Sequence, residues 1–329
     1  MPSAKASELL AAVANAPARA AETKLKAAQD RIKLLEALVE DQAEQIDRKA
    51  RATWKLPKAA KFASGGSYTR LIVPDVHSAN AEPEAVAAML GDLDKIGGEV
   101  RSVIHLGDFL DCGGFLAQHH TLGYVAEMSY SFADDIDAGN NILDEIKTRT
   151  PKSEDEIVEG NHDRRIQKWC VTMACGNQKD AEYLLRQHSL AAVLHLKKRG
   201  IKHYEQGRFY DGLSIPATIM RGKCAFTHGE KSGRHATAAT LADFGCNVVH
   251  GHTHRADSAS SGTVKTGEIV AWCPGCLCKK QPLWNHTRPT KWTHGYAIQL
   301  VMKSGEFLHI NVPIIDGKSF LEPLLARLG

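Results

Sequence analysis

The chain has 329 residues, 43% of them apolar and 24% charged, and 41 basic against 38 acidic residues give a formal net charge of +3. This near balance excludes the strongly basic composition of a dedicated nucleic-acid coat protein, although a local basic patch is compatible with it. No stretch approaches about 18 uninterrupted apolar residues, the N-terminus lacks the apolar core of a secretory signal, and the eight cysteines are scattered. We therefore expect a cytoplasmic protein that does not span a membrane.

The first part of the chain, residues 1–55, is rich in Ala, Glu, Lys, Arg and Gln and contains no glycine. One core position of a heptad pattern is occupied by Leu25, Ile32, Val39 and Ile46. The pattern predicts an amphipathic helix, which either forms a coiled-coil homodimer or packs on its own domain. Residues 56–67, with Pro57, Gly65 and Gly66, are typical of a linker, so the main domain is predicted to span 68–329.

The main domain alternates apolar runs with helical patterns. In chain order we predict a strand in "RLIVPDVH", a helix over 83–96, a strand in "VRSVIHLGD", a helix over 132–148, a strand in "EIVEGNHD", a helix over 179–197, a strand in "KCAFTHG", a helix over 233–245 and a strand in "CNVVHGHTH". Three further strands, "EIVAW", "YAIQLVMK" and "EFLHINVP", follow, the last two joined at Ser304-Gly305. This order predicts an α/β sandwich of two sheets with flanking helices.

The segment 164–222 separates the third and fourth of these strands and is longer than a simple crossover needs. It contains Trp169 and the basic run "LKKRGIKHYEQGR". Two interpretations are open: a cap insert that selects the substrate, to which a nucleic-acid strand is suited, or an ordinary helical layer with a basic exposed face.

Five strands end in side chains that bind metals. These are Asp75 and His77; Asp108 and Asp111; Asn161 and His162; His228; and His252 and His254. Because the carboxyl ends of strands line the binding crevice of an α/β sheet, we expect these groups to meet. Carboxylate, imidazole and amide donors without thiolates suit Mn²⁺, Fe, Zn²⁺ or Ni²⁺, with Mn²⁺ favoured. The number of donors predicts two divalent ions, about 3.5–4 Å apart and bridged by a carboxylate.

The ordered motifs "DVH", "GDFLD", "GNHD", "HGE" and "GHTH" resemble the five motifs of the calcineurin-like metallophosphoesterase superfamily, with a likeness to its phage-encoded and bacterial members. The resemblance covers roughly residues 68–316 and implies a four-layer αββα sandwich. It also implies hydrolysis of phosphate esters by a metal-bridging hydroxide.

The resemblance assigns a role to each motif residue. Asp75, His77 and His254 would bind the first metal, Asp108 would bridge, and Asn161, His228 and His252 would bind the second. His162 would not be a ligand: it would stabilise charge on the phosphate and protonate the leaving oxygen. In the protein-phosphatase branch the second aspartate of the GDxxD motif orients this histidine, and Asp111 occupies that position.

Two departures separate the chain from that phosphatase branch, which has an arginine where Cys112 stands and a glutamate where Asp163 stands. They favour a phosphodiesterase that acts on nucleotides or nucleic acid, with a nuclease included. A phosphomonoesterase of broad specificity is the first alternative, and a non-catalytic scaffold is an alternative of another class.

Two arginines, Arg164 and Arg165, follow the "GNHD" motif and are candidate contacts to the substrate phosphate, because guanidinium groups match phosphate oxygens. The alternative is that they pair with acidic residues at the start of a helix. The cysteine-rich run "CPGCLC", from Cys273 to Cys278, sits where the family often has a tight turn, and we prefer that interpretation to a structural zinc site.

Overall fold

The computed structural model of the chain describes Lys26, Gln29 and residues 66–113, 116, 130–205, 217–264, 267–281 and 289–321. The chain divides into two units, Met1–Trp54 and Lys55–Gly329, and the fold below is that of the second. The predicted N-terminal coiled coil and the linker lie outside the described residues, apart from two single positions and the end of the linker. None of the described helices has the length and apolar character that a membrane crossing requires.

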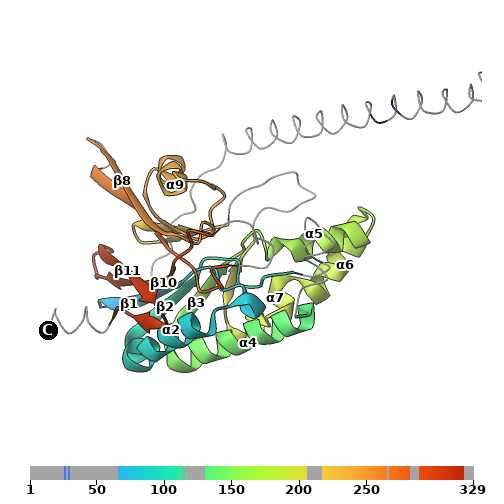
Figure 1. The fold of residues 1–329 in the computed structure, drawn as a ribbon, viewed down its shortest axis with the longest axis horizontal. Coiled ribbons are helices and arrows are strands. Elements are labelled where there is room, and N and C mark those ends of the chain that lie inside the picture. Colours follow the sequence, from blue (N-terminus) through green and yellow to red (C-terminus); the bar gives the residue numbers. More distant parts are fainter. Residues whose placement is uncertain are drawn as a thin grey trace, which may run out of the picture. The chain divides into compact units, whose positions relative to one another are not determined.

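Two β-sheets form the centre of the larger unit (Figure 1). The first contains, in spatial order, β12 (Lys318–Ser319), β11 (Phe307–Ile315), β10 (His294–Val301), β1 (Tyr68–Val73), β2 (Val100–His105), β3 (Glu154–Val158) and β4 (Lys202–Tyr204). The second contains β5 (Thr218–Arg221), β6 (Cys224–Thr227), β7 (Asn247–His250), β9 (Gly267–Pro274) and β8 (Ala256–Thr263). Strands β1 to β4 are parallel, as are β6, β7 and β9, so the carboxyl ends within each set share one edge.

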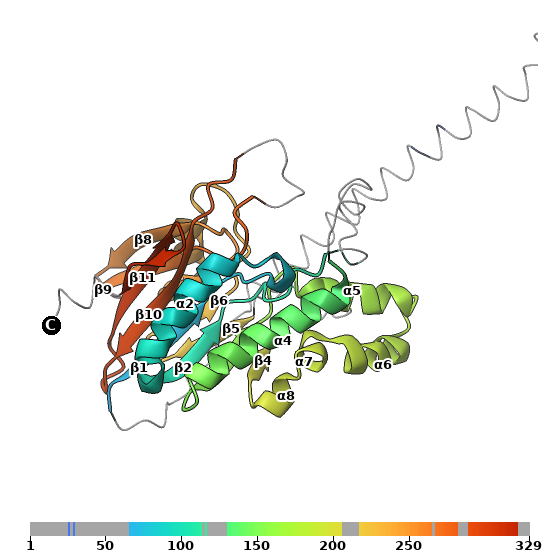
Figure 2. The same cartoon turned by 60° about the horizontal axis from the view of Figure 1, so that its bottom comes forward.

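Helices cover the outer face of each sheet (Figure 2). The larger sheet carries α2 (Pro83–Ile96), α4 (Phe132–Arg149), α5 (Arg164–Met173), α6 (Gln178–His188), α7 (Leu190–Val193) and α8 (Leu196–Arg199), and the smaller carries α9 (Ala236–Phe244). The described residues also include two short 3-10 turns, η1 (Ser78–Asn80) and η2 (Gly97–Glu99). The layers confirm the predicted α/β sandwich.

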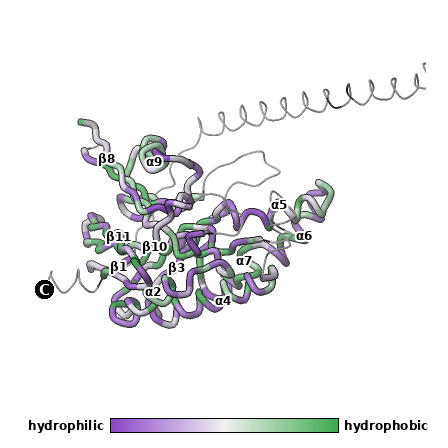
Figure 3. The backbone as a smooth tube through the Cα atoms, viewed as in Figure 1, coloured by the Kyte–Doolittle hydropathy of each residue, from purple (hydrophilic) through white to green (hydrophobic). Residues whose placement is uncertain are grey.

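Alternation along the strands explains the layering. Leu71 and Val73 of β1 are buried against the helices, whereas Ile72 between them is buried against the smaller sheet with Phe226 and Val249. The second halves of β1, β2 and β3 are mostly apolar and buried, and green segments run through the interior in Figure 3. Strands buried on both faces hold their carboxyl ends in fixed positions, where the polar loops begin.

Most predicted elements are confirmed, and one is wrong. The helix expected over 179–197 is three helices, because Ser189 adopts an extended conformation (ψ 158°) and His195 a left-handed one (φ 49°). The Ser189 hydroxyl accepts a hydrogen bond from the Ala192 amide at 3.3 Å and so begins α7 as an N-cap.

The segment 164–222, where the sequence allows a cap insert, contributes to the hydrophobic core between the larger sheet and its helices. Ile166 and Cys170 of α5 and Leu190 of α7 belong to the cluster that packs on the larger sheet. Its two described strands, β4 and β5, form an edge of the larger and of the smaller sheet respectively. The described part of this segment therefore behaves as a helical layer of the sandwich.

Candidate metal centre

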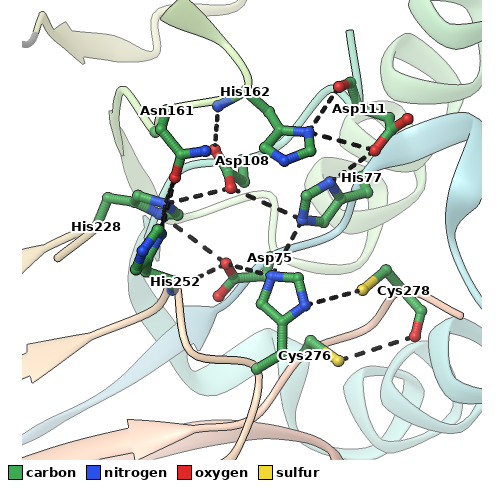
Figure 4. Close-up of polar contacts among 12 residues, drawn as sticks. Asp75, His77, Asp108, Asp111, Asn161, His162, His228, His252, Cys276 and Cys278 are labelled. Carbon is green, nitrogen blue, oxygen red and sulfur yellow. Dashed lines mark hydrogen bonds and ion pairs between the residues drawn. The ribbon is translucent and has the colours of Figure 1, made fainter. Parts of the chain in front are cut away.

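The predicted ligands from the two sheets meet in one place (Figure 4). Asp75, His77, Asp108 and Asn161 follow β1, β2 and β3 of the larger sheet, while His228, His252 and His254 follow β6 and β7 of the smaller. In Figure 4 the side chains of those that are labelled, which are all but His254, point toward a common centre. The fold thus brings all seven residues together.

A first group of donor atoms comprises Asp75, His77, Asp108 and His254, one atom from each lying within 4.8 Å of the others. His254 Nε2 lies 3.2 Å from Asp75 Oδ1 and 3.2 Å from His77 Nε2. His77 Nε2 is 3.8 Å from Asp108 Oδ2. All four residues are buried, so the group is shielded from solvent.

A second group adjoins the first and shares Asp108 with it. It contains Asp108, His228 and His252. His228 Nε2 lies 3.2 Å from Asp108 Oδ2, and the Asn161 amide oxygen lies 2.9 Å from His228 Nε2 and 2.8 Å from His252 Nδ1. One carboxylate oxygen, Asp108 Oδ2, therefore faces histidines of both groups, as a bridging ligand does.

The donor set fits two divalent cations. His77 Nδ1 donates to Asp111 Oδ1 at 3.0 Å and His228 Nδ1 donates to the Leu106 carbonyl at 2.9 Å, so their Nε2 atoms can turn lone pairs inward. Asp75 Oδ2 is buried without a hydrogen-bond partner. A buried carboxylate oxygen without a donor is costly unless a cation is its partner. Oxygen and imidazole donors match Mn²⁺, Fe, Zn²⁺ and Ni²⁺.

Within the second group, burial and the neighbouring charges shift the pKa values of the residues. Burial alone lowers the pKa of His228, but the Asp108 carboxylate outweighs it and raises that pKa to about 9. Burial likewise raises the pKa of Asp108, but His228 and the other histidines bring it well below its usual value. For His252, burial and then His228 lower the pKa to about 4. Without a metal ion, the Asp108 carboxylate therefore favours the positively charged imidazolium of His228. A bound metal ion would supply that positive charge in its place.

The backbone is left-handed at five of the seven predicted ligands. The φ angles are 21° at Asp75, 49° at His77, 46° at Asp108, 69° at His252 and 55° at His254. Residues with a Cβ rarely adopt this conformation, and each such position costs about 1–3 kcal/mol unless its surroundings impose it. Strain of this kind gathers at functional sites.

Two glycines let the ligand-bearing loops approach one another. A Cβ on Gly160 would lie 2.2 Å from Asp108 Oδ1, and one on Gly251 would lie 2.4 Å from Asp75 Oδ2. Because no side chain fits there, glycine is required by space at both positions.

His162 faces the same centre but belongs to neither of the two groups described above. Its Nδ1 donates to the Asp111 carbonyl oxygen at 2.7 Å and lies 3.4 Å from Asp111 Oδ1, whereas the Asp111 carboxylate is closer to His77. The Tyr130 hydroxyl donates to the other oxygen of Asp111. Asp111 therefore contacts His162 and the candidate ligand His77 together.

The two arginines have different surroundings. Arg165 Nη1 donates to the carbonyl oxygens of Asp111 and Cys112, at 3.1 and 3.3 Å, and its Nη2 donates to His162 Nε2 at 3.2 Å. Arg164 lies near the carboxylates of Glu159 and Glu230, and burial lowers its pKa. Arg165 therefore contacts His162 and the loop that carries Asp111.

Asp163 ties two ligand-bearing loops together. Its buried carboxylate accepts hydrogen bonds from the amides of Gly160 and Leu110, both at 3.0 Å, and from Phe109 at 3.4 Å. The loop after β3 is thereby held against the loop after β2. This geometry supports a structural role for the aspartate that follows the Asn161-His162 pair.

The pocket over the centre, about 160 Å³, has four lining residues that the sequence did not single out for the site: Asn80, Cys278, Lys279 and Trp292. Cys278 Sγ lies 3.6 Å from His254 Nδ1, and the Trp292 ring centroid is 4.1 Å from that of His254. Both residues come from the connection between β9 and β10, which passes the "GHTH" loop only in the folded chain. No spacing in the sequence signals this contact.

The "CPGCLC" run forms the predicted turn where β9 ends. Pro274 is the last residue of β9, Gly275 has a φ of 105°, and the Cys276 amide donates to the Thr293 carbonyl at 2.9 Å. Among the described residues, Cys278 is the only cysteine in a candidate metal group, with His77 and His254.

No family model and no curated protein matches the chain. Among solved structures it is similar to Vps29 from Chaetomium thermophilum, with 9% identity, 74% of this chain and 96% of that chain covered, and a TM-score of 0.33. It is also similar to the hypothetical protein PH1004 from Pyrococcus horikoshii OT3, with 13% identity and a TM-score of 0.37, and the match covers 80% of this chain and 92% of that chain. At these TM-scores the likeness does not bear on function, which is argued from the geometry of the site.

Proposed function

We propose that the protein is a dimetal-dependent phosphoesterase that hydrolyses phosphodiesters of nucleotides or nucleic acid. The observation that carries the proposal is the position of Asp108 Oδ2, which faces histidines of two adjoining donor groups while His162 faces the same pocket outside both. A bridged pair of metals beside a non-ligand histidine is suited to hydrolysis at phosphorus.

Two divalent ions held by these residues would activate a water molecule and neutralise charge on the phosphoryl oxygens. The chain's own residues do the rest. His162 Nδ1 is fixed as a donor by the Asp111 carbonyl oxygen, so Nε2 is the atom that faces the substrate. It carries the proton that the leaving alcohol oxygen requires.

Arg165 has to change partner for this step. Its Nη2 donates to His162 Nε2, which must then be unprotonated, since a guanidinium cannot accept a hydrogen bond. A phosphate oxygen is a stronger acceptor for the guanidinium fork. We propose that substrate draws Arg165 onto the phosphate, which leaves Nε2 free to take up a proton from solvent and then give it to the leaving oxygen. Arg164, beside Glu159 and Glu230, is a weaker candidate for a substrate contact.

A diester is preferred to a monoester on grounds of charge. A diester phosphate carries one negative charge near neutral pH, whereas a monoester carries between about 1.5 and 2. Arg165 is one guanidinium beside His162, and Cys112 offers only its carbonyl to that guanidinium. One arginine suits the smaller charge.

The test is a substrate panel with purified protein and Mn²⁺: bis-p-nitrophenyl phosphate, p-nitrophenyl phosphate, and labelled single- and double-stranded DNA. We expect the diesters to be hydrolysed faster than the monoester, with two metal ions bound per chain. Activity on the monoester alone would replace the diesterase with a phosphatase. Two bound ions without activity on any of these substrates would favour the alternative of a non-catalytic scaffold.

For the N-terminal unit we propose a coiled-coil homodimer, which rests on the heptad pattern alone. Deletion of residues 1–55 is expected to convert the dimer to a monomer, with the number of chains per particle measured by light scattering. An unchanged number of chains would remove the coiled-coil dimer without affecting the proposed activity.

A further inference from the structure

Two short segments run together along the rim of the pocket. The Thr290 hydroxyl donates to the Lys280 carbonyl, and the Thr290 amide donates to Gln281 Oε1 at 3.3 Å. The Lys279 amide donates to the Asn80 carbonyl at 2.9 Å, which fixes the first segment on η1. The Thr293 amide donates to the His254 carbonyl at 2.8 Å, which fixes the second beside the metal centre.

These contacts collect three lysines and a tryptophan, which we call the lysine–tryptophan strip: Lys279, Lys280, Lys291 and Trp292. The lysines are exposed and Trp292 is half-buried. Lys279 and Trp292 line the pocket that contains His162 and Asp108. The strip is thus continuous with the site.

The strip lysines differ from several lysines elsewhere on the protein in their ion pairing. Lys147, Lys202, Lys223 and Lys231 each form an ion pair with a carboxylate. Within the part of the chain that the structure describes, the three strip lysines form none. Their charges are therefore not neutralised locally and face solvent next to a site suited to phosphate.

We infer that the lysine–tryptophan strip binds single-stranded nucleic acid, with a base stacked on Trp292 and the phosphates that flank the scissile one on the lysines. The inference rests on the proposed function, whose substrate class it narrows. Lysines along a backbone track together with an aromatic platform are the combination by which proteins bind single strands. A duplex keeps its bases stacked inside, so its bases cannot reach Trp292 without being unpaired.

The competing role for Trp292 is support of His254, whose ring it contacts at 64° between planes. Two substrates with the same leaving group separate these roles: the p-nitrophenyl ester of thymidine 5′-phosphate and methyl p-nitrophenyl phosphate. For Trp292→Ala we expect kcat/KM on the thymidine ester to fall roughly five- to 150-fold, as loss of one base stack predicts. The fall on the methyl ester, which has no base to stack, should be smaller than the fall on the thymidine ester, and Trp292→Phe should retain most of the preference for the nucleoside. An equal fall on both esters would make Trp292 a support of His254 and overturn the stacking role.

The lysines are tested by salt dependence on a labelled oligothymidylate. Each phosphate contact to a single strand contributes about −0.7 to the slope of log affinity against log salt concentration. The triple variant Lys279→Gln, Lys280→Gln, Lys291→Gln should make the slope about 2 units less steep. The control triple Lys179→Gln, Lys197→Gln, Lys198→Gln, also exposed, should behave as the unmodified protein. An unchanged slope in the strip variant would overturn the lysine role.

The two hypotheses fail differently. Hydrolysis of the methyl ester with Mn²⁺, but cleavage of duplex DNA as fast as of a single strand, would sink the inference and leave the phosphodiesterase standing. No hydrolysis of any diester would remove the proposed function itself.

Discussion

The two sheets bring different chemistry to the metal centre. The larger sheet supplies Asp75, Asp108, the amide of Asn161 and His162, which lies outside the two groups that share Asp108, while the smaller sheet supplies only imidazoles to those groups. Each donor group draws on both sheets: His254 completes the first, and His228 and His252 complete the second. The larger sheet therefore carries the residues proposed for catalysis, and the smaller sheet closes the coordination. Bound metals would clamp one sheet to the other.

The strongest way to break this arrangement is Asp108→Asn, since Asp108 faces both groups. We expect metal content to fall from two ions to fewer than one. Turnover should drop by more than about ten-thousandfold, because metal ions supply several kcal/mol of charge stabilisation as well as the nucleophile. Elemental analysis and diester kinetics would check it. Two retained ions would show that Asp108 does not bridge.

His162→Ala separates the reaction from metal binding within the larger sheet. We expect both ions to remain and turnover to fall about 10²- to 10⁴-fold, the usual contribution of a general acid. The loss should be smaller for p-nitrophenyl leaving groups, which need little protonation, than for an alkyl diester. Loss of metal in this variant would show that His162 is a ligand.

Cys278→Ala tests the surroundings of His254, a candidate ligand that follows the smaller sheet. The substitution removes the contact between Cys278 Sγ and His254 Nδ1, while His254 Nε2 faces the other donors. Partners that orient a metal-binding histidine are typically worth 10- to 100-fold in metal affinity, and we expect a loss in that range, confined to one of the two ions. Cys278→Ser retains a hydrogen-bonding group and should restore most of the affinity. Titration with Co²⁺, followed by its visible absorption, would measure both. Equal affinities in all three proteins would leave Cys278 without influence.

The smallest expected effect is the release of about one proton from the second group when metal binds at about pH 7.5, with a further contribution from His254, whose pKa Asp75 raises against the effect of burial. Asp108 raises the pKa of His228 to about 9, so the metal-free residue is protonated there, and binding requires its lone pair. His252, with its pKa lowered to about 4, releases none. Affinity should therefore rise with pH up to about 9 and level off above it. Calorimetry in buffers of different ionisation enthalpy counts the proton, and heats that do not depend on the buffer would contradict the assignment.

Sequence patterns predicted the centre better than its surroundings. The motif residues each follow a buried strand, and parallel strands must deliver their ends to one edge, so Asp75, Asp108 and Asn161 could be placed together in advance. Strand β8, "ADSASSGT", was not predicted because its composition is that of a loop and its pairing with β9 makes it a strand. Cys278 and Trp292 were missed because their contact with His254 joins parts of the chain that only the tertiary fold brings together.

The left-handed backbone at five candidate ligands has a consequence for engineering. Glycine adopts positive φ without strain, so His252→Gly is expected to relieve local strain while removing a donor from the second group. The thermal stability of the metal-free protein would then rise while its affinity for metal falls. Directed evolution that selects only for thermal stability would favour more stable variants that have lost activity. Such selections therefore need an activity screen as well.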